Sequence, residues 1–127
     1  MGHPADRKYS QDHEWVTLDG SVATVGITDY AQDQLGPVVY IDLPSAGDDV
    51  SAGDTFGEIE SVKSVSELFS PVTGEIIEVN DTLVDASETV NSDPHGEGWM
   101  IKVRLEDASE VTSLMTAEEY EASLAEG

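Results

Sequence analysis

Lys63 is the residue whose surroundings best suit it for chemistry, because two short runs of alternating acidic and apolar residues flank it. Residues 58–60 and 65–69 have the two-residue period of half-buried β-strands. Residues 61–64, SVKS, lie between these runs and are predicted to form a hairpin turn. A lysine at the tip of a hairpin is exposed, so another protein can approach its amine.

Other residue combinations offer less chemistry. His3, His13 and His95 do not have the spacing of metal ligands, so a structural or exposed role is expected for each. The chain has no cysteine, which excludes disulfides and thiolate nucleophiles, so any sulfur chemistry must come from an attached group. The sequence shows neither a glycine-rich phosphate loop nor a Ser-His-Asp order. These features argue against an independent hydrolase or oxidoreductase.

The net charge is the most unusual property of the composition. The 127-residue chain has 27 acidic residues against 5 lysines and arginines, which gives a formal net charge of −22. This excess argues against partners such as nucleic acid or anionic membranes, which need basic residues. The hydrophobic content of 39% argues against disorder. Acids spread along the whole chain indicate a halophilic organism with a salty cytoplasm, where their repulsion is screened.

The sequence shows no membrane-targeting segment. It has no run of about 18 apolar residues, so no transmembrane helix is predicted. Its polar start does not have the pattern of a signal peptide, and a cytoplasmic location is expected. Gly2 and His3 are either native or a remnant of expression tagging, and the sequence leaves both readings open.

The first half of the chain is predicted to place strands around one short helix. Residues 14–18 and 21–27 are predicted strands joined by an Asp-Gly pair, which is typical of hairpin turns. Thr28 is the predicted N-cap of a helix that ends near residues 36–37, a Gly-Pro pair. Residues 38–43 follow as a strand, and their continuous apolar start predicts burial on both faces.

The second half is predicted to complete a mainly β fold. Residues 75–79 and 99–105 are predicted strands, with short helical turns in residues 81–91. The tripeptide Gly-Glu-Ile occurs on both sides of Lys63, which suits two related halves that face each other in a flattened β-barrel or sandwich. A capping box in residues 116–119 predicts a C-terminal helix that runs to about Leu124. Its narrow apolar stripe is expected to pack on the β core and consists of Ala117, Tyr120, Ala122 and Leu124.

Several ordered motifs resemble the glycine cleavage system H protein family, and together they cover nearly the whole chain. Residues 60–65 (ESVKSV) and 70–75 (SPVTGE) are similar to the lipoyl-attachment segment of the family. Residues 9–16 resemble the opening segment of the family, and residues 25–32 resemble its second segment. Residues 90–94 and 98–99 resemble later segments. The resemblance implies a single carrier domain over residues 1–127, with the lipoyl/biotinyl-type fold.

The resemblance implies a carrier and not an enzyme, with lipoate attached to Lys63 through an amide as the cofactor. The disulfide of such an arm accepts a group and two electrons together. The implied cargo is an aminomethyl group, passed from glycine decarboxylase (P protein) to an aminomethyltransferase (T protein). Reducing equivalents would pass to dihydrolipoamide dehydrogenase (L protein), and a lipoate-attaching enzyme would modify Lys63.

Glu14 is the second predicted site residue. Its spacing alone indicates one more surface acid, whereas the resemblance places it in a cleft that holds the loaded arm. A carboxylate opposite an ammonium group is physically reasonable there. The family often has histidine where this chain has Tyr30 and Gln34, and the sequence assigns no role to either residue.

The alternative function is a lipoyl domain, or a lipoyl-relay protein, that serves 2-oxo acid dehydrogenases. Such a domain would be shorter and tethered to a catalytic chain. The additional N-terminal strands and the C-terminal helix favour the H protein interpretation.

Overall fold

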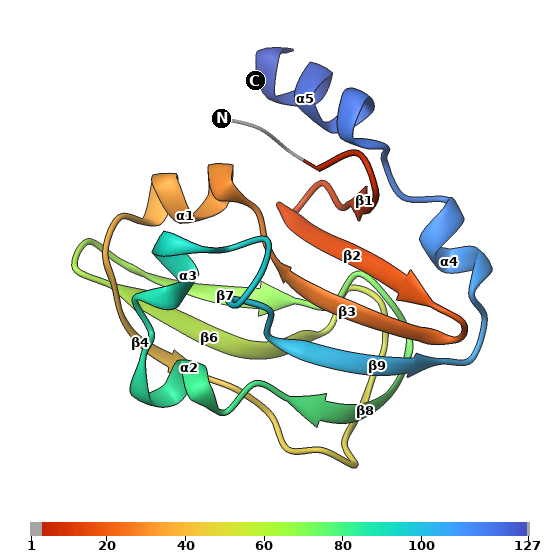
Figure 1. Ribbon diagram of the computed structural model, residues 1–127, viewed down its shortest axis with the longest axis horizontal. Coiled ribbons are helices and arrows are strands. Elements are labelled where there is room, and N and C mark those ends of the chain that lie inside the picture. The colour runs from red at the N-terminus through yellow and green to blue at the C-terminus, as the bar shows by residue number, and fades with distance from the viewer. Residues whose placement is uncertain (1–3, 127) are drawn as a thin grey trace.

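The computed structural model describes residues 4–126, so Gly2 and His3 lie outside the described residues. Its strands form two antiparallel sheets (Figure 1). The larger sheet has the strand order β1 (Lys8–Tyr9), β2 (Glu14–Asp19), β3 (Val22–Ile27), β9 (Ile101–Leu105), β8 (Gly74–Val79) and β5 (Asp49–Val50). The smaller sheet contains β4 (Val38–Asp42), β6 (Thr55–Ser61) and β7 (Val65–Phe69).

The main hydrophobic core lies between the two sheets, which form a flattened sandwich and not a closed barrel. The isoleucines of the two Gly-Glu-Ile tripeptides belong to this core and come from different sheets. Ile59 on β6 and Ile76 on β8 are both completely buried. Gly57 and Gly74 let neighbouring strands approach closely, because a Cβ atom at either position would collide with a backbone carbonyl oxygen. The predicted mainly β sandwich is confirmed.

Helix α1 (Asp29–Leu35) begins and ends where the sequence predicts. The Thr28 hydroxyl oxygen accepts a hydrogen bond from the Ala31 amide at 3.1 Å, which caps the helix. Gly36 stops the helix with a φ of 77°, a left-handed conformation that glycine adopts without steric cost. Helices α2 (Thr82–Asp85) and α3 (Thr89–Ser92) confirm the predicted short helical turns.

The C-terminal helix α5 (Ala117–Glu126) lies beside β1 and outside the two sheets (Figure 1). Its capping box is formed, because the Glu119 amide donates to the Thr116 hydroxyl and the Thr116 amide donates to the Glu119 carboxylate. Tyr120 is completely buried and stacks on Tyr9 at a centroid distance of 4.9 Å. The predicted stripe is wrong at Ala122, which is exposed.

A second prediction, that the strand starting at residue 38 is buried on both faces, is wrong. Val38 and Ile41 are buried, but Val39 and Tyr40 are each 53% exposed, so the strand is not buried on both faces. Strand β4 is an edge strand of the smaller sheet and pairs only with β6 within it. A β-bulge between Val38 and Tyr40 shifts its register, so a continuous apolar run does not give continuous burial.

Two short elements were not predicted from the sequence, strand β1 and helix α4 (Ser109–Thr112). Each is too short to show a hydrophobic period. Among residues 4–126, no helix is long and apolar enough to cross a membrane.

Candidate functional site

Lys63 lies at the tip of the hairpin that connects β6 to β7, and its side chain is exposed. The Ser61 amide donates to the Ser64 carbonyl at 2.8 Å and closes the turn. The Ser61 hydroxyl oxygen accepts hydrogen bonds from the amides of Lys63 and Ser64, each at 3.2 Å. These bonds fix the backbone of the turn, so the predicted hairpin turn is confirmed and presents the amine from a rigid base.

The stem of Lys63 lies across the end of helix α1. A Cβ atom at Gly36 would stand 2.9 Å from Cε of Lys63, so glycine lets the stem lie close to the helix end in this conformation. Leu35, the residue before Gly36, lines a cleft beside the hairpin. Ser64, the residue after Lys63, lines the same cleft, so the lysine hairpin lies beside it. Helix α1 lies on the same side of the molecule as the β6–β7 hairpin (Figure 1).

The cleft has a volume of about 360 Å³ and is bounded by the loop before β2, by helix α1 and by strand β7. Apolar side chains from both sheets and from the helix form much of its wall, while carboxylates, an imidazole and an amide supply polar groups. Its lining residues are Asp12, His13, Glu14, Ile27, Tyr30, Ala31, Gln34, Leu35, Ile59, Ser64, Ser66, Glu67 and Leu68. The cleft is thus suited to a thin, mainly apolar chain that ends in a polar group.

Glu14 is the most deeply buried ionisable group of the cleft, with only 2% of its surface exposed. The Ser10 hydroxyl donates to its carboxylate at 2.6 Å, and a main-chain hydrogen bond comes from Phe69. Burial raises the pKa of Glu14 to about 8, although the bond from Ser10 opposes this shift. At pH 7 the carboxyl group is therefore mostly protonated while no cation faces it.

Comparisons with known proteins identify the family of this chain. The sequence matches the family described as "Glycine cleavage H-protein" over residues 7–127. The chain belongs to the glycine cleavage H-protein family. A relative named glycine cleavage system H protein, from Carboxydothermus hydrogenoformans, is 49% identical over 123 residues, which cover 97% of this chain and 95% of the relative.

A solved structure supports the same assignment at the level of the fold. The crystal structure of a glycine cleavage system H protein from Mycobacterium marinum has a TM-score of 0.88 and 41% sequence identity. The match covers 97% of this chain and 99% of the other. The fold described above is therefore the fold of the H-protein family, and the additional N-terminal strands and C-terminal helix belong to it.

In this H-protein family member, the cleft brings together residues that the sequence left apart. Glu14, Tyr30 and Gln34 all line it, so the two positions without a predicted role are cleft positions. His13 also lines the cleft, which sequence spacing did not indicate. The only sequence feature that could have placed His13 in the cleft is its position directly before Glu14. Lys63 is not among the lining residues, although its neighbour Ser64 is.

The burial of Glu14 predicts a specific dependence of stability on pH. The pKa of Glu14 is about 8 in the folded protein against an ordinary value of 4.5, so the folded state binds this proton more tightly. Its contribution to the free energy of unfolding is complete below pH 4.5 and is lost as the pH rises through 8. We expect Glu14→Gln to remove this decline, which should amount to a few kcal/mol for a shift of this size.

Urea denaturation at fixed potassium chloride, repeated between pH 4.5 and 9, measures this effect. Glu58→Gln is the control, because Glu58 is an exposed acid of β6 that does not line the cleft. The control should keep the pH dependence of the parent. If Glu14→Gln followed the parent curve, Glu14 would not be the group that titrates.

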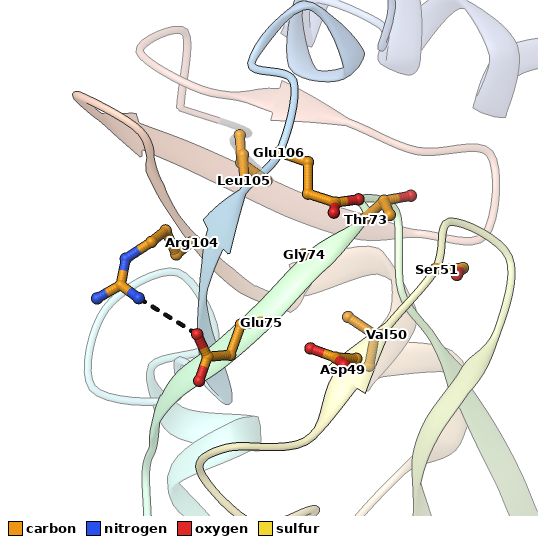
Figure 2. Close-up of a pocket in the computed structure, with 9 residues that line it drawn as sticks. All are labelled: Asp49, Val50, Ser51, Thr73, Gly74, Glu75, Arg104, Leu105 and Glu106. Carbon is orange, nitrogen blue, oxygen red and sulfur yellow. Dashed lines mark hydrogen bonds and ion pairs between the residues drawn. The ribbon is translucent and has the colours of Figure 1, made fainter.

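A larger cavity of about 450 Å³ lies at a different place, among β5, β8 and β9, and shares no lining residue with the cleft (Figure 2). Arg104 forms an ion pair with Glu75 there at 3.2 Å, and Asp49 faces Glu75 across the strand pair. Its walls contain no histidine and no lysine. Among residues 4–126 no group of three or more acidic, histidine or cysteine side chains could hold a metal ion. The cleft, not this cavity, is the candidate site.

Proposed function

We propose that this H-protein family member is a lipoyl-bearing carrier that shuttles an aminomethyl group between the enzymes of glycine cleavage. The observation that carries the proposal is the exposed Lys63 on a hydrogen-bonded hairpin beside a cleft that contains a buried carboxyl group. Membership of the family supports this reading. A carrier of this kind does no chemistry by itself, because the attached arm and the partner enzymes supply the reaction.

The residues on this face fit a lipoyl group. Lys63 would hold it through an amide, and Gly36 leaves room for the arm to pass. When attached, the group supplies a disulfide that accepts the carried group together with two electrons. The apolar part of the cleft wall, which includes Ala31, Leu35 and Leu68, suits the hydrocarbon part of the arm.

Glu14 is proposed to hold the amine of the cargo. A neutral carboxyl group and a neutral amine that meet in the cleft exchange one proton and become a carboxylate and an ammonium group. The ammonium then compensates the charge that burial otherwise makes unfavourable at Glu14. A protonated amine has no lone pair with which to expel the sulfur that carries it, so Glu14 slows premature loss of the cargo.

The proposed partners are glycine decarboxylase, aminomethyltransferase and dihydrolipoamide dehydrogenase, together with a lipoate-attaching enzyme. They would meet a surface with many acids and few cations, which is not a surface for nucleic acid or anionic membranes. The whole of residues 1–127 is proposed to act as one carrier unit in a cytoplasmic setting.

Intact mass tests this function directly. The lipoylated protein is incubated with glycine and glycine decarboxylase, and its mass is expected to increase by one aminomethyl group. Incubation with a 2-oxo acid dehydrogenase and its substrate is the comparison. Acylation by that enzyme without any loading from glycine would support the alternative role as a 2-oxo acid dehydrogenase relay and contradict the present proposal.

The role of Glu14 is tested on the loaded protein. We expect Glu14→Ala to release formaldehyde and ammonia about ten times faster or more than the parent, since hydrogen bonds to charged groups contribute roughly 1.5–3 kcal/mol. The decay of the loaded mass with time measures this rate. Glu58→Gln, outside the cleft, should decay at the parent rate. Equal rates for Glu14→Ala and the parent would remove Glu14 from the site.

A further inference from the structure

The hydroxyl group of Tyr120 on the C-terminal helix makes two contacts behind the cleft. It lies 2.7 Å from Nδ1 of His13 and 2.8 Å from Oγ1 of Thr28. Tyr120 is completely buried; its contact with Thr28 is buried and its contact with His13 is partly buried. His13 and Thr28 precede Tyr120 in the sequence by 107 and 92 residues.

The two partners of Tyr120 belong to different walls of the cleft. His13 lines the cleft and directly precedes Glu14, and its backbone has a φ of 68°, a left-handed conformation that histidine adopts at some cost. Thr28 caps helix α1, which carries Tyr30 and the rest of the helical wall. The rings of His13 and Tyr30 lie 4.9 Å apart, so the two walls also touch inside the cleft. This hydroxyl group therefore adds a side-chain link between helix α1 and the start of β2, where Glu14 lies, beside the main-chain bond from the Thr28 amide to the His13 carbonyl.

The hydroxyl protons can be ordered along this chain of contacts. The Thr28 oxygen already accepts the Ala31 amide, so its own proton is available to the Tyr120 oxygen. If Tyr120 in turn donates to Nδ1 of His13, the neutral imidazole has its proton on Nε2. Burial lowers the pKa of His13, which favours this neutral ring. In this arrangement Tyr120 would set the tautomer of a histidine in the cleft wall.

We propose that Tyr120 is a positioning residue for the cleft, through which the C-terminal helix holds His13, Thr28 and the adjoining start of β2 in the geometry that protects the cargo. This inference rests on the proposed function of the cleft. It assigns to the C-terminal helix a role beyond covering the Tyr9 and Trp15 side chains.

Tyr9 provides a matched control. Its ring stacks on Tyr120, and its hydroxyl group donates to the Pro4 carbonyl at 2.6 Å. Tyr9→Phe thus removes a hydroxyl group from the same aromatic cluster without touching the walls of the cleft. Tyr120→Phe keeps the stacked ring and removes the two hydroxyl contacts that reach the cleft.

The first measurement needs neither lipoate nor partner enzymes. The ¹⁵N chemical shifts of the His13 ring, recorded by NMR on the unmodified full chain, report its tautomer and the hydrogen bond at Nδ1. We expect these shifts to change in Tyr120→Phe and to stay at parent values in Tyr9→Phe. Unchanged His13 shifts in Tyr120→Phe would overturn the proposal whatever the cargo does.

The second measurement is the decay of the loaded protein. The net loss of a neutral hydrogen bond predicts roughly a three- to tenfold faster release of formaldehyde from Tyr120→Phe than from Tyr9→Phe. His13→Phe removes the same contact without altering α5 and should have a similar effect. The double variant that combines Tyr120→Phe and His13→Phe should decay no faster than the faster single variant, because both substitutions break the same contact between Tyr120 and His13. If the two increases in decay rate multiplied in the double variant, Tyr120 and His13 would act separately, and the proposal would be overturned.

The Glu14→Gln variant distinguishes a failure of the role proposed for Tyr120 from a failure of the function proposed for the cleft. If Glu14→Gln loses its cargo quickly while Tyr120→Phe decays like Tyr9→Phe, the cleft holds the cargo and the role of Tyr120 is wrong. If Glu14→Gln also decays at the parent rate, the proposed function of the cleft fails and the positioning role fails with it.

Discussion

We expect Lys63→Arg to abolish glycine decarboxylation in a system reconstituted with the partner enzymes, while the fold persists. Arginine keeps the positive charge but its guanidinium group does not form the stable amide that a lysine amine forms. The Ser61 hydrogen bonds that close the turn involve backbone amides at residues 63 and 64, so they do not depend on the side chain at position 63. Carbon dioxide release from glycine measures activity, and circular dichroism measures the fold.

Lys102→Arg is the control for this experiment. Lys102 lies on β9, with its amine 3.7 Å from the Glu78 carboxylate and 5.1 Å from the centre of the Trp99 ring. These contacts accept a guanidinium group equally well, so this variant should keep full activity. Peptide mapping of the lipoylated parent should find the modification on Lys63. A lipoyl group on Lys8 or Lys102, or full activity in Lys63→Arg, would refute the assignment.

The sequence predicts those parts of this fold that depend on local signals. The Thr28 cap, the Gly36 stop, the turn around Lys63 and the capping box before α5 each need only a few neighbouring residues, and all four are present. The alternation of apolar residues likewise places most strands. Local signals suffice because capping, turn geometry and side-chain alternation are properties of short segments.

The parts that the sequence did not predict depend on contacts between distant segments. The exposure of Tyr40 follows from the edge position and the bulge of β4. The contact between His13 and Tyr120 joins residues 107 positions apart. The pKa of Glu14 depends on how completely other segments cover it. Periodicity contains none of this information, and only the resemblance pointed to Glu14 as a site residue.

The arrangement of the acids explains why salt should matter for this protein. Asp42, Glu58 and Glu67 lie directly opposite one another across the smaller sheet, and all three are exposed. Asp49 and Glu75 form a similar pair in the larger sheet. Like charges in such positions destabilise a sheet by up to about 1 kcal/mol per pair. Within residues 4–126, ion pairs join only Arg7 to Asp6, Lys102 to Glu78 and Arg104 to Glu75.

Single substitutions can show which acids repel one another. Glu58→Gln removes an acid that faces acids on both sides, whereas Glu78→Gln removes one that is paired with Lys102. At low salt, Glu58→Gln should raise the melting temperature, while Glu78→Gln should leave it unchanged or lower it. The difference between the two variants should shrink in molar salt, because exposed charges are then screened.

We therefore expect the melting temperature of the parent to rise strongly between 0.1 M and 3 M potassium chloride. The screening length falls from about 10 Å at 0.1 M to about 3 Å at 1 M, which suppresses repulsion among the 27 acids. Because each kcal/mol moves the melting temperature of a small protein by roughly 4 °C, several kcal/mol of relieved repulsion corresponds to a rise of about 10 °C or more. Thermal denaturation followed by circular dichroism measures this rise. A melting temperature that stays flat or falls with salt would mean that the acids are not an adaptation to high salt.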